Sequence, residues 1–174
     1  MQYEIKKGKE FRQSIVTINE YDDDNYCDIF ATKLKFTDEV APKGIELTDL
    51  SNDGDGSVVG WIDGDTYKVS TQEKGQKVIF NEDCKSMFGM FEHEDFGEIQ
   101  RIFKEIDFAM IDTSNVKDMS EMFHNCFDLK ELNLSGFDTS QVYWSMSRMF
   151  ANCENLESLD LSSFDTTNYT RRHE

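Results

Sequence analysis

The apolar residues in the C-terminal half of the chain recur in three short stretches that keep the same internal spacing. These stretches are IDTSNV, FDTSQV and FDTTNY at 111–116, 137–142 and 164–169; MSEMFHNC and MSRMFANC at 119–126 and 146–153; and LKELNLSGF and LESLDLSSF at 129–137 and 156–164. Successive copies are offset by 26 or 27 residues, and a degenerate earlier copy begins at Phe103. Self-similarity at a fixed period of this length is typical of repeat proteins.

Each copy predicts one strand and one short helix. The L-x-x-L-x-L stretch alternates apolar and polar residues, as a half-buried strand does, and apolar residues at i, i+3, i+6 and i+7 predict one face of a helix. In the second copy these residues are Leu129, Leu132 and Leu134 for the strand and Val116, Met119, Met122 and Phe123 for the helix. Asp112 or Ser114 is the expected helix N-cap. Because one copy cannot bury its apolar face alone, neighbouring copies must stack.

The predicted fold class is therefore α/β, a short leucine-rich-repeat solenoid of about 2.5 to 3 repeats over residues 81–174. A β-rich module is expected over residues 1–80, where β-branched and aromatic residues cluster between turn signals. The expected strands lie at 14–18, 27–36, 44–48, 58–62, 67–69 and 77–80, with a short helix at 84–91. Asp63-Gly64 predicts a hairpin turn between two of these strands.

The repeat is interrupted by one extra residue in its third copy, at Tyr143-Trp144. The preceding copy has the polar pair Lys117-Asp118 at the equivalent place. Large aromatic residues where the pattern favours charge are candidate anchors for a protein partner. The alternative is that the extra residue packs its ring against the neighbouring copy. Phe127, which stands where the next copy has an acid, is a weaker candidate of the same kind.

The repeat F-D-T-S-x-V-x-x-M-x-x-M-F-x-x-C-x-x-L-x-x-L-x-L-S resembles that of the BspA-like leucine-rich-repeat family of bacterial surface proteins. DGSVVGWIDGDTYKV with FNEDCKSMF resembles the module that often precedes those repeats, so the resemblance covers roughly residues 49–168. It implies an adhesion or protein-binding module, of the kind found in bacteria and their phages, without catalytic activity. This chain departs from typical relatives because it shows no signal peptide, few repeats and no capping unit. The open final strand is expected to be covered by a partner, by a second copy in a homodimer, or by the charged tail.

Acidic residues outnumber basic ones, 35 to 18, which gives a net charge of −17. This balance argues against direct binding to nucleic acid, whose phosphates would be repelled. Two interpretations stay open: a solvated acidic surface that keeps the chain soluble, or a surface that imitates a polyanion in a basic groove of a partner protein. The candidate acidic contacts are Asp22, Asp23, Asp24, Asp53 and Asp55.

The sequence predicts no catalytic site, no metal site and no cofactor. Cys126 and Cys153 occupy equivalent positions, but a zinc site would need further ligands such as His124 or Cys84, so a core position is the favoured interpretation. The aspartates of residues 49–55 resemble a calcium loop only superficially, because its twelfth position would be a glycine and not a glutamate. No nucleophile motif or phosphate-binding loop accompanies the histidines, so the chain is not expected to be an enzyme.

The favoured function is a non-catalytic protein-binding module that uses the face near Tyr143 and Trp144, with acidic side chains for steering. One alternative is a phage-type intracellular inhibitor of a host defence nuclease, similar to an anti-CRISPR protein, whose acidic surface mimics nucleic acid. The other is a fragment of a bacterial surface adhesin. The N-terminus has no apolar run of a signal peptide, and no stretch is long enough to span a membrane. We therefore expect a cytoplasmic location, or the cell surface if a signal has been removed.

Overall fold

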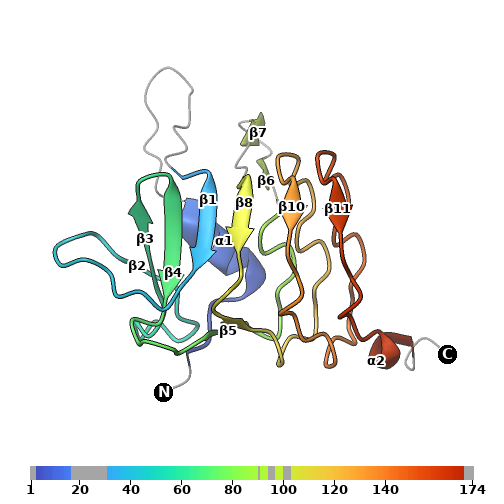
Figure 1. Cartoon of the computed structure of the whole chain (residues 1–174), viewed down its shortest axis with the longest axis horizontal. Helices are drawn as coiled ribbons and strands as arrows, with labels where there is room; N and C mark the ends of the chain where they lie inside the picture. The colour runs from blue at the N-terminus through green and yellow to red at the C-terminus, as the bar shows by residue number, and fades with distance from the viewer. Residues whose placement is uncertain (1–2, 17–30, 90, 94–96, 100–102, 171–174) are drawn as a thin grey trace.

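The computed structural model describes residues 3–16, 31–89, 91–93, 97–99 and 103–170 (Figure 1). Its helices are α1 (Gly8–Val16) and α2 (Thr167–Thr170). Its strands are β1 (Lys33–Phe36), β2 (Thr48–Asp49), β3 (Val59–Asp63), β4 (Thr66–Ser70), β5 (Val78–Ile79), β6 (Phe91–His93), β7 (Gly97–Ile99), β8 (Glu105–Asp107), β9 (Ile111–Asp112), β10 (Glu131–Leu132) and β11 (Ser158–Leu159). Within the described residues, no helix is both long and apolar enough to cross a membrane.

The largest sheet joins the N-terminal residues to the first copy of the repeat. Its strand order is β2-β3-β4-β1-β8, with β3 and β4 antiparallel and β1 parallel to both β4 and β8. The predicted hairpin is confirmed: Gly64 turns the chain between β3 and β4 with a φ of 61°, which glycine adopts without a steric penalty. β10 and β11, the strands of the later copies, pair in parallel, and Figure 1 shows them continuing the row beyond β8.

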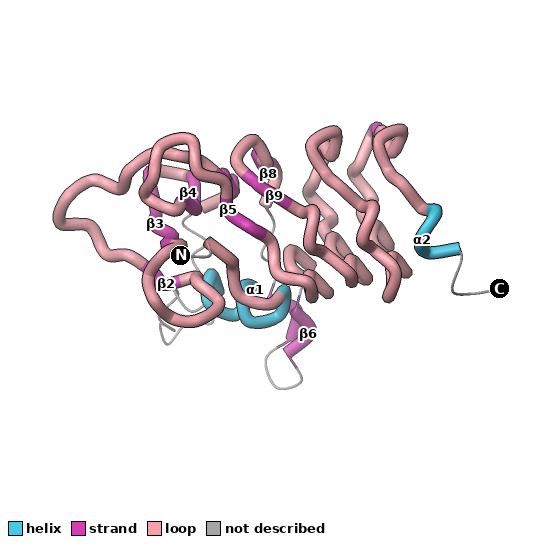
Figure 2. Tube along the Cα trace, turned by 90° about the horizontal axis from the view of Figure 1, so that it is seen from below, coloured by secondary structure: helices cyan, strands magenta, loops and turns pink. Residues whose placement is uncertain are grey.

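The expected leucine-rich-repeat solenoid, with a strand and a short helix in each repeat, is wrong. The structure consists mostly of small mixed sheets joined by turns, and Figure 2 shows the repeated segments as loop where helices were expected. The predicted helix at 84–91 is likewise absent: residues 84–89 form turns and loop, and Phe91 begins β6. The inward positions were nevertheless predicted correctly, because Leu129, Leu132 and Leu134 are all buried.

The backbone conformation of the repeated segments explains why they are not helical. Glu121 and Asn125 have φ values of 57° and 63°, which lie in the left-handed region and end any right-handed helix. The N–H groups of Met122 and Cys126 bond to carbonyls three residues back, as in turns with a left-handed third residue. Alternate N–H groups instead cross to the next copy, so they are not available for helix hydrogen bonds.

The N-terminal segment also differs from expectation. Residues 14–16, predicted to begin a strand, belong to α1, whose Phe11 and Ile15 lie one turn apart and are both buried. The predicted strand at 27–36 is confirmed only for Lys33–Phe36, and the one at 44–48 shrinks to β2. The predicted strands near 58–62, 67–69 and 77–80 are confirmed as β3, β4 and β5.

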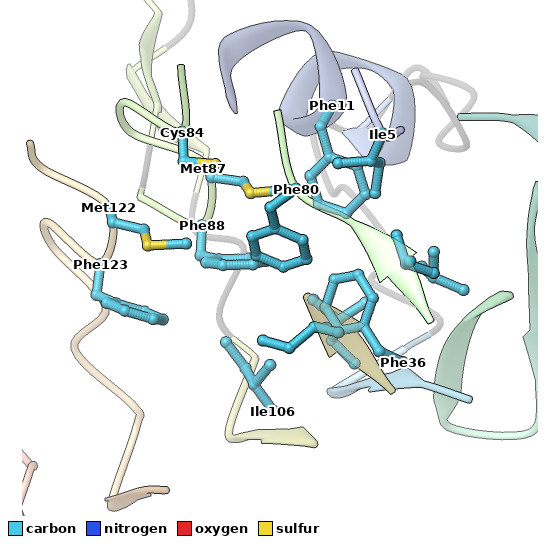
Figure 3. Packing of buried hydrophobic residues seen from close by; sticks show 14 of the residues in the cluster. Ile5, Phe11, Phe36, Phe80, Cys84, Met87, Phe88, Ile106, Met122 and Phe123 are labelled. Carbon is cyan, nitrogen blue, oxygen red and sulfur yellow. The ribbon is translucent and has the colours of Figure 1, made fainter. Parts of the chain in front are cut away.

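Phenylalanine rings from successive copies stack to form part of the core. The ring centroids of Phe88 and Phe123 are 5.3 Å apart at 19°, and those of Phe123 and Phe150 are 5.6 Å apart at 5°. Phe11 of α1 and Phe36 of β1 meet the edge of this column at Phe88 (Figure 3). Burial of each such ring contributes about 1.5–3 kcal/mol. One cluster of buried side chains therefore includes residues from both the N-terminal segment and the repeats.

Candidate functional site

The bridges Asp83–Asp118 and Asp118–Ser145 show that the first copy begins near Glu82, ahead of its recognisable stretch at Phe103. Backbone hydrogen bonds place Trp144 at the position that Lys117 and Glu82 occupy in the two preceding copies. The N–H groups of Lys117 and Asp118 both donate to the carbonyl of Glu82, at 2.8 and 3.1 Å. Those of Tyr143 and Trp144 both donate to the carbonyl of Lys117, at 3.2 and 2.9 Å. Asp118 also bridges to Ser145, so the extra residue of the third copy is Tyr143.

The side chains of this row are held in contact with one another. The Lys117 ammonium lies 5.6 Å from the centroid of the Trp144 ring, within range of a cation–π interaction, and it also forms an ion pair with Glu82. The hydrogen bond that the Lys117 ammonium donates to the Glu82 carboxylate raises the pKa of Lys117, so the ammonium stays charged. The Tyr143 ring meets Trp144 edge to face, with centroids 5.9 Å apart. These contacts restrict the rotamers of Trp144.

Trp144 nevertheless keeps 46% of its surface exposed. It is the one aromatic residue among the exposed large hydrophobic side chains of the described chain; the others are Val40, Ile45, Leu47, Ile62 and Leu161. The geometry therefore combines both interpretations of the aromatic insertion. The ring contacts the neighbouring copy through Lys117 and still presents a large apolar face to solvent.

A polar cleft of about 380 Å³ opens beside this row. It is lined by Glu4, Lys7, Asn52, Asn81, Glu82, Asn115 and Lys117. Lys117 lines the cleft and also contacts Trp144, and Glu82 of the cleft pairs with Lys117, so the two features form one continuous surface. The Asn52 side chain donates to Glu4 across the cleft at 2.8 Å. We call Trp144, Tyr143 and this cleft the aromatic–polar surface.

Asp53 and Asp55, predicted as acidic contacts, lie beside Asn52 in an exposed loop. Their carboxylates also close the loop: Asp53 accepts from the N–H of Asp55 at 3.3 Å, and Asp55 accepts from that of Ser57 at 2.8 Å. The hydrogen bonds from Ser57 lower the pKa of Asp55, which keeps this carboxylate ionised. The loop thus adds negative charge at the Asn52 end of the cleft.

The other predicted contacts are not placed at this surface. Phe127 is half buried, and its carbonyl accepts from the Asn155 side chain at 2.8 Å, so it serves to join two copies. Asp22, Asp23 and Asp24 lie outside the described residues.

The repeated cysteines occupy core positions. The thiols of Cys126 and Cys153 donate to the carbonyls of Phe88 and Phe123, at 3.3 and 3.1 Å. Burial raises the pKa of both thiols, which favours the protonated form over the thiolate that binds metals. Among the described residues, no group of three or more histidine, cysteine or acidic side chains is arranged to hold a metal ion.

Sequence reasoning missed the role of Glu82 and Lys117 in this surface. Lys117 could have been found, because it aligns with the aromatic insertion one copy later. Glu82 aligns with it only after an offset of 35 residues, since β6 and β7 lie between the two copies. The cleft itself depends on Glu4, Lys7 and Asn52, which are brought there by tertiary structure.

Comparison with protein families gives a match over the repeats. Residues 82–174 match a family model described as "Mycoplasma protein of unknown function, DUF285". No curated protein and no solved structure matches the chain. The matched region begins at Glu82 and therefore includes Lys117, Tyr143 and Trp144.

Proposed function

The chain belongs to the family described as Mycoplasma protein of unknown function, DUF285, and we propose that it is a non-catalytic protein-binding module that binds through its aromatic–polar surface. The observation that carries this proposal is the half-exposed Trp144 ring, held between Lys117 and Tyr143. Tryptophan is enriched among residues that dominate binding energy. A ring that is already ordered loses little conformational entropy when a partner covers it.

The polar cleft supplies the second part of the proposed interface. Interfaces commonly surround an apolar anchor with polar groups that exclude water and fix the orientation of the partner. The amides of Asn81 and Asn115 and the charged groups of Lys7, Glu82 and Lys117 are suited to that role. The net charge of −17 favours a partner with a basic face, because opposite potentials accelerate association.

A second candidate function rests on that charge alone. In it, the chain imitates a polyanion and occupies the nucleic-acid groove of a partner, as an intracellular inhibitor of a nuclease would. The two proposals differ in what should weaken the complex. Anchoring by Trp144 predicts dependence on one side chain, whereas mimicry predicts dependence on salt and competition by DNA or RNA.

A pull-down tests both proposals. The chain is immobilised and incubated with lysate of the cells that encode it, and quantitative mass spectrometry measures which proteins are captured. If Trp144 is an anchor, Trp144→Ala should reduce capture of the partner by about tenfold or more, which corresponds to a loss of about 1.4 kcal/mol or more. Ile62→Ala is the matched control, since Ile62 is an exposed hydrophobic residue of β3 outside this surface.

The outcomes separate the candidates. A partner lost with Trp144→Ala but retained with Ile62→Ala, at both low and high salt, supports the anchor. A partner retained by both variants and released by salt or by added DNA supports mimicry instead. Identical capture under every condition contradicts both.

A further inference from the structure

Along residues 84–88 and 119–125, the backbone hydrogen bonds to the next copy run in one direction. N–H groups of each copy donate to carbonyls of the next one, and the described chain repeats this at two junctions. The bonds are Cys84 to Asp118, Ser86 to Ser120 and Phe88 to Met122 at the first junction, and Met119 to Ser145, Glu121 to Ser147, Phe123 to Met149 and Asn125 to Ala151 at the second, with N···O distances of 2.9–3.0 Å. Along these segments, each copy therefore has a donor edge and an acceptor edge.

The acceptor edge of the first copy is covered by α1. The N–H of Gly8 donates to the carbonyl of Asp83 at 2.8 Å, and the Arg12 guanidinium donates to the carbonyl of Gly89 at 3.2 Å. The fit is close, because a Cβ on Gly8 would lie 2.4 Å from the carbonyl oxygen of Lys85. The acceptor edge of the first copy therefore receives hydrogen bonds from α1.

The donor edge of the third copy has no such cover within the described part of the chain. The equivalents of the four donors at the second junction are the N–H groups of Met146, Arg148, Phe150 and Asn152. None of these four makes a hydrogen bond to any described residue. Arg148 and Asn152 have φ values of 55° and 62°, matching Glu121 and Asn125, so the edge already has the backbone shape of the paired copy.

An apolar pocket of about 340 Å³ lies beside this edge. It is lined by Met146, Met149, Phe150, Leu161, Phe164 and Thr166. The phenyl ring of Phe150 ends the stacked column that begins at Phe88, so a further aromatic ring placed here would extend the column. Where Phe123 packs on the third copy, the same combination of ring stacking and alternate hydrogen bonds holds two copies together.

We propose that this donor edge and its apolar pocket bind a backbone segment of a partner protein that presents a row of carbonyl oxygens together with a phenylalanine or methionine side chain. Carbonyl oxygens and apolar side chains of this kind cover the donor edges of the first and second copies within the chain. The surface is distinct from the aromatic–polar surface around Trp144, and the inference does not depend on the function proposed there.

The direction of the bonds argues against a second copy of this chain as the occupant. A two-fold dimer through this edge would set N–H groups against N–H groups, which leaves donors without acceptors. Head-to-tail association would require the acceptor edge of the first copy, which α1 already covers. A homodimer through this donor edge is therefore not the arrangement that the geometry favours.

Amide hydrogen exchange followed by NMR on the full chain tests the proposal. The probe is a synthetic peptide of residues 145–152, capped at both ends, because this segment covers the equivalent edge of the second copy. In the chain alone, the four edge amides should exchange faster than those of Met119, Glu121, Phe123 and Asn125. Millimolar peptide should slow exchange at the four edge amides by about three- to tenfold, the range expected for a gained hydrogen bond.

Two variants of the chain provide a matched pair. Leu161→Glu places a charge in the pocket and should abolish the effect of the peptide, whereas Leu47→Glu should leave it intact. Both leucines are exposed to a similar extent, 40% and 46%, and only Leu161 lines the pocket. Trp144→Ala should also leave the effect intact, so failure of this inference and failure of the proposed function are distinguishable.

Several results would overturn the proposal. One is unchanged exchange with peptide, and another is equal slowing by a scrambled peptide or by inorganic phosphate, which would indicate a general anion or backbone effect. Edge amides that are already slow in the chain alone would show that its own residues cover them. Slowing that appears only at high chain concentration would assign the edge to a second copy.

Discussion

Threonine side chains show at the scale of single residues how the copies are joined. The hydroxyl of Thr113 donates to the carbonyl of Asp138 at 3.1 Å and accepts from its N–H at 2.8 Å. Thr139 makes the same two bonds to Asp165 one copy later, and both threonines are fully buried. The Asp-Thr-Ser sequence was predicted to cap a helix. The flanking carboxylate of Asp112 does accept from Ser114, but in a turn, and the threonine between them carries the contact between copies.

Thr113→Val should destabilise the chain by about 1–3 kcal/mol, because the shape is kept while the N–H and the carbonyl of Asp138 both lose their hydrogen-bond partner. Urea unfolding followed by circular dichroism measures this loss. Thr113→Ser, which keeps the hydroxyl, is the control and should lose less. Equal losses for the two variants would mean that the methyl group, and not the paired hydrogen bonds, accounts for the contribution.

At the scale of elements, the docking of α1 depends on the absence of a side chain at Gly8. A Cβ there would lie 2.4 Å from the carbonyl oxygen of Lys85 and 2.7 Å from the carbonyl carbon of Cys84, both backbone atoms that cannot easily move. Gly8→Ala should therefore destabilise the chain by about 1–3 kcal/mol, although alanine favours a helix by about 1 kcal/mol. The midpoint of urea unfolding reports the difference.

Gly136→Ala is the matched control for this element. No atom lies within 4 Å of a Cβ at Gly136, and its φ is outside the left-handed region, so its midpoint should hardly change. If Gly8→Ala also left the unfolding midpoint unchanged, α1 would not be packed against the first copy as tightly as the structure has it.

Sequence patterns predicted elements well where one local rule decides the conformation. β3 and β4 follow from alternating apolar residues around an Asp-Gly turn. In the repeats, Val116, Met119, Met122 and Phe123 are buried as predicted. Their spacing did not decide the conformation, because stacked turns can bury residues at the same intervals as a helix does. A glutamate at position 121 gives no sequence signal for its left-handed backbone conformation. The helix over α1 was missed although Phe11 and Ile15 stand at i and i+4, because its β-branched end favoured a strand.

The candidate site, too, was predictable from the sequence only in part. The broken repeat marked Trp144, since an aromatic residue replaced a charged position. The cleft beside it was not predictable, because Glu4 and Asn52 reach Lys117 only through the tertiary fold.

At the scale of the whole molecule, two electrostatic effects oppose each other. The net charge of −17 makes the compact state repel itself, and added salt relieves this repulsion. Salt also weakens attractive pairs such as Lys33–Asp65 and Lys35–Asp107, but their side chains are 40–59% exposed, and exposed pairs contribute only about 0–1 kcal/mol each. The repulsion should therefore be the larger effect.

Raising NaCl from low to high concentration at neutral pH should increase the Tm, by about 2–4 °C for each kcal/mol of repulsion removed. The increase should level off once the screening length, about 10 Å at 0.1 M and 3 Å at 1 M, falls below the spacing of surface charges. KCl should act equally, since screening depends on ionic strength, whereas ion-specific stabilisation would separate the two salts. A Tm that falls with salt would show that the ion pairs outweigh the excess negative charge, and the acidic surface would then be part of what holds the fold together.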